Sequence, residues 1–92
     1  MDIVWDPAKA KSNAAKHGIC FADVEPAFYD EFALSMPDQF STAEERFLLV
    51  GRDALGRIIT VSYTYRSDDI RIISARQATK SEKSEYEKEL RL

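Results

Sequence analysis

The sequence contains little cysteine, glycine or proline: one Cys, three Gly and three Pro among 92 residues. The single Cys20 excludes an internal disulfide and a zinc cluster built on several cysteines. We expect it to be a small buried or half-buried residue, with a reactive thiol as the alternative. No internal repeat or low-complexity block is present, so the composition indicates an ordinary globular protein.

The sequence also lacks a long hydrophobic run. No segment approaches the roughly 20 apolar residues that a membrane-spanning helix needs. The first residues, from Met1 to Pro7, form neither a basic leader nor the apolar core of a signal peptide. We therefore expect a cytoplasmic protein without a membrane segment, folded as one domain over residues 1–92 with a modest core.

Two neighbouring segments differ in their charged residues: one has no basic residue, and the other has no lysine. Residues 21–45 contain no Lys or Arg, and their acids are Asp23, Glu25, Asp30, Glu31, Asp38, Glu44 and Glu45. Residues 46–76 contain three acids and no lysine, and their arginines are Arg46, Arg52, Arg57, Arg66, Arg71 and Arg76. The net charge of −3 argues against indiscriminate nucleic-acid binding, but guanidinium groups favour two-bonded contacts with phosphate. The alternative is that the arginines pair with the acidic segment.

Capping and turn residues divide the first half of the chain into short elements. Asp6 and Pro7 are typical of a helix start, and Gly18 of a helix end. The predicted elements are, in order, a strand over 2–5, a helix over 7–16, a helix over 22–29, a strand over 33–36 and a polar loop over 39–45.

The second half predicts an antiparallel meander. Alternating residues indicate strands over 46–52, 57–66 and 70–76, joined by a hairpin loop over 53–56 and a turn over 67–69. Thr79 and Glu82 match a capping box, from which a helix continues to about Leu90. The predicted fold class is α+β: a small antiparallel sheet, made of this meander and one or two short strands, with two N-terminal helices and one C-terminal helix.

The strand over 70–76 carries two arginines in a hydrophobic ladder. Charged side chains are rarely buried unless they are paired or bind a ligand. One or both arginines are therefore expected to face a phosphate. The alternative is an edge strand whose arginines form salt bridges. Regular alternation separates Arg71 from Arg76 onto opposite faces, and only a bulge would change this.

The first helix has a polar face formed by Lys9, Asn13, Lys16 and His17, at spacings of three and four. By the residues alone, exposure to solvent explains this face, and Lys16 and His17 also complement the helix dipole. Trp5, just before the helix, is expected to lie in the core.

Together these residues resemble the BrnT-type toxins of bacterial toxin–antitoxin pairs, which have a RelE-like ribonuclease fold. The resemblance covers nearly the whole chain, which departs from the commonest pattern of the family chiefly in Tyr65, between Thr64 and Arg66, and in the acidic composition of the middle segment. It is carried by Trp5-Asp6-Pro7 with Lys9, Asn13 with Lys16-His17-Gly18 and Phe21, Phe28 with Asp30, Asp38, Glu45-Arg46, Gly51, Arg57, Tyr63-Thr64, and Arg71-Ile72-Ile73-Ser74-Ala75-Arg76 with Ala78, Glu82 and Tyr86.

The resemblance implies an endoribonuclease toxin that needs neither metal nor cofactor and uses the 2′-hydroxyl of the RNA as nucleophile. It also implies a BrnA-like ribbon-helix-helix antitoxin, which neutralises the toxin, supplies the contacts to operator DNA and represses the operon together with it. The acidic stretch from Asp23 to Glu45 is then a candidate docking surface for basic antitoxin residues. The rival hypothesis is a non-catalytic antitoxin-binding or corepressor module with the same fold.

Given the resemblance, we expect catalytic roles for Arg76, Arg71, His17 and Arg66. Arginines suit the charge of the transition state, and histidine is the residue type that transfers protons near neutral pH. Arg76→Ala is expected to abolish toxicity and to leave antitoxin binding intact. RNA binding is expected from Lys9, Lys16, Arg57, Tyr63 and Tyr86, although a buried position in the sheet is the alternative for Tyr63.

Overall fold

The structure is a computed structural model that describes residues 2–40 and 44–90. Its elements are β1 (Ile3–Val4), α1 (Pro7–His17), the 3₁₀-helices η1 (Phe21–Asp23) and η2 (Glu25–Tyr29), β2 (Leu34–Pro37), β3 (Phe47–Arg52), β4 (Ile58–Arg66), β5 (Asp69–Gln77) and α2 (Lys80–Glu89). Residues 41–43 of the predicted polar loop lie outside the described residues. The α+β class and the predicted first and last helices are confirmed.

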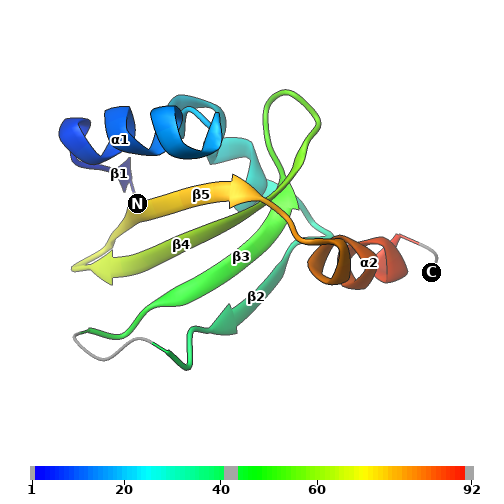
Figure 1. Cartoon of the computed structure of the whole chain (residues 1–92). Helices are drawn as coiled ribbons and strands as arrows, with labels where there is room; N and C mark the ends of the chain where they lie inside the picture. Colours follow the sequence, from blue (N-terminus) through cyan, green and yellow to red (C-terminus); the bar gives the residue numbers. More distant parts are fainter. Residues whose placement is uncertain (1, 41–43, 91–92) are drawn as a thin grey trace.

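One five-stranded sheet has the order β1-β5-β4-β3-β2 (Figure 1). Strands β2 to β5 pair antiparallel, which confirms the predicted meander. The prediction of a purely antiparallel sheet was wrong, because β1 runs parallel to β5, with Ile3 opposite Ile70. Strand β1 is too short for its own residues to indicate a partner, and the pairing joins the N-terminal residues to β5, which precedes the C-terminal helix. The sheet is therefore mixed.

The predicted second helix is also different in detail. Residues 22–29 do not form one α-helix, because Pro26 lies in the first turn of η2 and has no N–H to donate. Bonds between residues three apart, such as Val24 N–H to the Phe21 carbonyl at 3.1 Å, produce two short 3₁₀ turns instead. The apolar residues of this segment still face the core, since Phe21 and Val24 are buried and Phe28 is partly buried against them.

The two faces of the sheet are covered unequally. The main core lies on the face covered by η1 and η2, where Ile59, Val61 and Ile72 are fully buried. On the other face, α2 lies at one end of the sheet, where Tyr86 packs against Val50 and Ile58 (Figure 1). Polar side chains of β4 and β5 occupy the remainder of this second face.

A β-bulge changes the alternation of β5. Ser62 lies opposite Ser74 and Tyr63 opposite Ile72, so Ile73 is an extra residue without a cross-strand partner. Arg71 consequently pairs across the ladder with Thr64, and Arg76 with Thr60. Because Thr60 and Thr64 share one face of β4, the two arginines lie on the same face, and the expectation from regular alternation was wrong.

Two single-residue predictions are corrected around α1. Cys20 is exposed rather than buried or half-buried. Trp5 retains 36% of its accessible surface and is not a core residue. The helix itself begins as expected, with Asp6 accepting a bond from the Ala8 N–H, and it ends at Gly18, whose φ of +69° is readily adopted by glycine.

Candidate functional site

Helix α1 runs beside β5, beyond the short stretch of that strand that β1 covers, and Asn13 joins the two. The buried Asn13 amide donates to the Ala75 carbonyl at 2.8 Å and accepts from the Ala75 N–H at 3.0 Å. It also donates to the Ile19 carbonyl at 3.0 Å, just beyond the helix end. The side chain thus replaces a neighbouring strand at this position and holds α1 against β5, so the polar face of the helix borders the strand edge.

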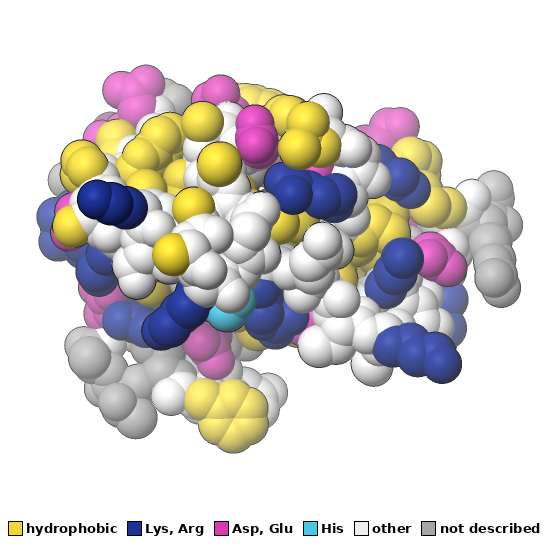
Figure 2. Space-filling model, turned by 45° about the horizontal axis from the view of Figure 1, so that its top comes forward, with side chains coloured by type: hydrophobic (Ala, Val, Ile, Leu, Met, Phe, Trp, Pro, Cys, Tyr) yellow, Lys and Arg dark blue, Asp and Glu magenta, His cyan; other side chains and the backbone are white. Residues whose placement is uncertain are grey.

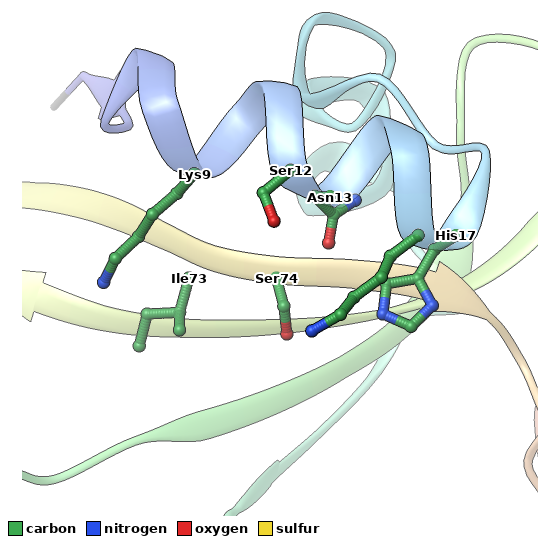
Figure 3. A pocket seen from close by; sticks show the side chains of 7 residues that line it. Lys9, Ser12, Asn13, His17, Ile73 and Ser74 are labelled. Carbon is green, nitrogen blue, oxygen red and sulfur yellow. The ribbon is translucent and has the colours of Figure 1, made fainter.

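A hollow of about 160 Å³ lies between α1 and β5. Figure 3 shows Lys9, Ser12 and His17 extending from α1 toward β5, where Ile73 and Ser74 border the same space. Lys16 completes the lining. The volume is below the roughly 300 Å³ of the smallest typical ligand pockets, so the shape suits one small polar group at the surface rather than an enclosed ligand.

The two lysines and the histidine of this hollow have no intramolecular partners among the described residues. Lys9, Lys16 and His17 are all exposed, and none of their side chains makes an ion pair or hydrogen bond there. Figure 2 shows the only histidine of the chain, in cyan, at the surface with Lys or Arg side chains on both sides. The arrangement favours an anionic ligand, because each cation keeps its charge available.

A second hollow of about 200 Å³ lies at the start of α1, and two arginines that were predicted to be catalytic line it. It is lined by Val4, Trp5, Asp6, Arg66 and Arg71. The fold therefore distributes the four predicted catalytic residues: His17 lies in the first hollow, Arg66 and Arg71 lie in the second, and Arg76 lies in neither.

Arg76 is engaged with α2. Its guanidinium donates to both carboxylate oxygens of Glu82, at 2.7 and 3.0 Å, and to the Gln77 carbonyl at 3.2 Å. The hydrogen bonds from Arg76 lower the pKa of Glu82 from 4.5 to about 2, and the same contact raises the pKa of Arg76. Although 38% of the Arg76 side chain is exposed, its charge is already matched.

Arg57, predicted to bind RNA, forms an ion pair with a buried acid. Its Nη2 lies 2.7 Å from Oδ2 of Asp53, whose side chain is completely buried. Its Nη1 also donates to the Gly18 carbonyl at 3.3 Å. These bonds tie the β3–β4 hairpin to the end of α1, which gives Arg57 a structural role in the fold.

The two predicted tyrosines have no ring face open to a base. Tyr63 is 5% exposed, its hydroxyl lies 2.9 Å from the Ser35 hydroxyl, and burial raises its pKa. Tyr86 is 1% exposed and donates to Asp30 at 2.6 Å. Burial, followed by this bond to a carboxylate, raises the pKa of Tyr86. Both tyrosines are core residues, which agrees with the alternative considered for Tyr63 and was not expected for Tyr86.

Sequence reasoning missed two hydroxyls of the first hollow, Ser12 and Ser74. Ser12 follows Lys9 by three residues and precedes Lys16 by four, so helical spacing was sufficient to find it. Ser74 had no comparable signal, because the bulge that sets its position depends on pairing with β4.

Over residues 2–40 and 44–90, no group of three or more His, Cys, Asp or Glu side chains is arranged to hold a metal ion. None of the helices in those ranges has the length and apolar character required to cross a membrane.

Comparisons with known proteins place this chain in a class. Over residues 5–82 the sequence matches the family model described as "Ribonuclease toxin, BrnT, of type II toxin-antitoxin system", so the chain belongs to this family of ribonuclease toxins. Among solved structures, it is similar to the crystal structure of the Brucella abortus ribonuclease toxin BrnT, with 33% sequence identity and a TM-score of 0.69. The alignment covers 87% of this chain and 99% of that chain. A comparison with curated protein sequences gives no match. The resemblance stated from the residues is confirmed.

Proposed function

We propose that the chain cleaves RNA without a metal ion and that the scissile phosphate binds in the hollow between α1 and β5. The observation that supports this site is the convergence of Lys9, Lys16 and His17, none of which has an intramolecular partner among the described residues. The family is one of ribonuclease toxins, and RNA is a polyanion, so a surface with available cations is the first requirement.

In the proposed reaction, the 2′-oxygen attacks the adjacent phosphorus and the bond to the 5′-oxygen of the next nucleotide breaks, which leaves a 2′,3′-cyclic phosphate and a 5′-hydroxyl. His17 takes the proton from the 2′-hydroxyl and returns it to the leaving 5′-oxygen, the role for which imidazole is suited near neutral pH. Lys9 and Lys16 stabilise the additional negative charge on the phosphate. The hydroxyls of Ser12 and Ser74 are placed to donate hydrogen bonds to its non-bridging oxygens.

The test is cleavage of an RNA oligonucleotide in EDTA by the purified, antitoxin-free chain. His17→Asn is expected to lower kcat by about 100-fold or more, as is typical for loss of a group that transfers protons. Lys16→Gln is expected to lower kcat/KM in the same assay. The matched control is Lys11→Gln, which removes the same charge from an exposed position of α1 that does not line the hollow.

Full activity of the His17→Asn variant would contradict the assignment of the site. No cleavage by the wild-type chain, with or without added metal, would favour the rival function of a non-catalytic module that binds antitoxin. The expected loss of toxicity in Arg76→Ala stays a prediction, and its stability must be measured in parallel because Arg76 holds Glu82.

We also propose that the antitoxin partner, which the family implies, is a BrnA-like ribbon-helix-helix protein that supplies the operator DNA contacts and represses the operon with this chain. Both proteins are expected in the cytoplasm. Exposed acids, including Glu31, Glu44 and Glu45, offer a docking surface for basic antitoxin residues. Replacing Glu44 and Glu45 together with lysine is expected to weaken the complex, and unchanged affinity in a titration would contradict this surface.

A further inference from the structure

Trp5 presents an aromatic surface beside two arginines. Its ring contacts Phe21 edge to face, with centroids 6.2 Å apart and planes at 77°, so one side of the indole is anchored on the core. The ring nevertheless lines the second hollow and retains 36% of its accessible surface. A tryptophan fixed on one side and open on another is suited to stacking on a planar ligand.

The two arginines of this hollow form no ion pair with an acidic side chain among the described residues. Neither Arg66 nor Arg71 makes a side-chain ion pair or hydrogen bond within residues 2–40 and 44–90. Arg71 is placed by two ladders, since its backbone lies between Val4 of β1 and Thr64 of β4. The nearest acid in the lining, Asp6, accepts the N-cap bond from Ala8 and so remains at the helix start.

The second hollow lies at the start of α1 and shares β5 with the first. Arg71 lies three residues before Ser74 on β5, and Asp6, the N-cap of α1, lies three residues before Lys9. Three residues of an extended strand span about 10 Å at most, so Arg71 and Ser74 lie within this distance of each other along β5. Neighbouring nucleotides of one RNA strand can reach both residues.

We propose that the second hollow is a subsite for a nucleotide flanking the scissile phosphate, in which the base stacks on Trp5 and Arg71 and Arg66 hold the phosphate. This inference rests on the proposed ribonuclease function. It adds the residues that would bind the substrate beside the scissile phosphate. Stacking combined with guanidinium contacts is the typical way in which proteins bind single-stranded nucleic acid. An antitoxin segment could also cover this hollow. RNA is favoured because the hollow offers both a stacking surface and cations without an ion pair among the described residues, and because Arg71 lies three residues from Ser74 of the proposed reaction site on the same strand.

The single tryptophan makes the subsite directly observable. Titration of the antitoxin-free chain with a 2′-O-methyl RNA oligonucleotide, which has no free 2′-hydroxyl to attack, is expected to quench Trp5 fluorescence. In the cleavage assay, Trp5→Leu is expected to raise KM by roughly 5- to 150-fold, the usual cost of losing one stacked base, and to leave kcat nearly unchanged. Arg71→Gln, which keeps Trp5 as the reporter, is expected to shift the quenching curve to higher RNA concentration.

The matched controls remove an aromatic ring or a positive charge at positions outside the hollow. Tyr29→Leu deletes an exposed aromatic ring of η2, and Lys83→Gln deletes an exposed charge of α2; neither lines the hollow, and both are expected to bind RNA as the wild type does. Circular dichroism establishes that each variant is folded. Arg71→Gln carries the test if Trp5→Leu does not fold.

Three outcomes would overturn the subsite: no quenching by the oligonucleotide, an unchanged KM in a folded Trp5→Leu variant, or loss of antitoxin affinity alone in the Trp5 and Arg71 variants. Failure of the proposed function is a different result. A wild-type chain that is quenched by RNA but does not cleave it would contradict the ribonuclease mechanism and support the RNA subsite.

Discussion

The carboxylate of Asp53 is completely buried in the β3–β4 hairpin, and Arg57 is the side chain that neutralises it. Oδ1 of Asp53 accepts the N–H groups of Leu55 and Arg57, and Oδ2 accepts Nε of Arg57 at 2.8 Å. Arg71 has the opposite surroundings, since no acid of the described residues pairs with it. At the scale of single residues, the same guanidinium group is structural at one position and available for a ligand at the other.

Replacing Arg57 with alanine is expected to lower the free energy of unfolding by about 3 kcal/mol, because it leaves a buried carboxylate without its counter-charge. Urea denaturation measures this effect. Cleavage of RNA below the unfolding transition is expected to be unchanged. A stable Arg57→Ala variant with weakened RNA binding would instead restore the RNA-binding role expected from the sequence.

At the scale of elements, two polar clusters attach α2 to the sheet. In one, Glu82 accepts from Arg76 and from the Thr60 hydroxyl, and it closes the capping box by accepting the Thr79 N–H at 2.8 Å. In the other, Tyr86 donates to Asp30 of the segment between η2 and β2. The position of the helix therefore depends on side chains from distant parts of the chain.

Glu82 is expected to make stability depend on acidic pH. Its folded pKa of about 2 is below the ordinary value of 4.5, so the unfolded state binds the proton more readily. The contribution is complete above about pH 4.5 and is lost as the pH falls toward 2. Allowing for solvent screening of this part-exposed pair, we expect about 1–2 kcal/mol.

The measurement compares the Tm of the wild type and of Glu82→Gln across this pH range. The difference between the two proteins is expected to shrink as the pH falls, because the other acids titrate in both. A constant difference would show that the Glu82–Arg76 pair does not contribute through its charge.

Tyr86→Phe is expected to destabilise the chain by about 1–2 kcal/mol, since it removes a hydrogen bond to a charged group and retains the packed ring. Burial alone would raise the pKa of Asp30, but hydrogen bonds from Tyr86 and from the Phe32 and Arg52 N–H groups lower it overall. Thermal unfolding measures the loss. The ring of Tyr29 is exposed, and its hydroxyl has no hydrogen-bond partner among the described residues. Tyr29→Phe is therefore the matched control and is expected to unfold like the wild type.

At the scale of the whole molecule, the net charge of −3 conceals a cationic strip. The two hollows between α1, β1, β4 and β5 bring together cations from three parts of the chain, namely Lys9, Lys16, Arg66 and Arg71, and His17 lies beside the two lysines. The acidic residues of 21–45 include exposed positions, such as Glu31 and Glu45, outside the linings of both hollows. The separation allows an acidic protein to present a local surface for RNA.

RNA binding is therefore expected to weaken with salt despite the negative net charge. Each phosphate contact with single-stranded nucleic acid contributes about 0.7 to the slope of log affinity against log salt. Lys16→Gln is expected to reduce the slope by about this amount, and Lys11→Gln to leave it unchanged. Titrations with the 2′-O-methyl oligonucleotide between 50 and 200 mM salt measure both, and equal slopes for the two variants would contradict a specific strip.

The sequence by itself determined the features that depend on near neighbours. The hairpin loop of residues 53–56, the Gly18 helix end and the Thr79 capping box follow from local hydrogen bonds and backbone preferences, and the structure contains all three. The ordered motifs likewise sufficed to identify the family.

Only the tertiary structure decided which side chains meet. The parallel pairing of β1, the bulge at Ile73 and the exposure of Trp5 depend on contacts between distant segments. A bulge of one residue reverses the alternation that follows it, and it brought Arg76 onto the same face as Arg71. Residue spacing reports the geometry of one helix or strand, whereas the partner of a charge is set by which elements pack together.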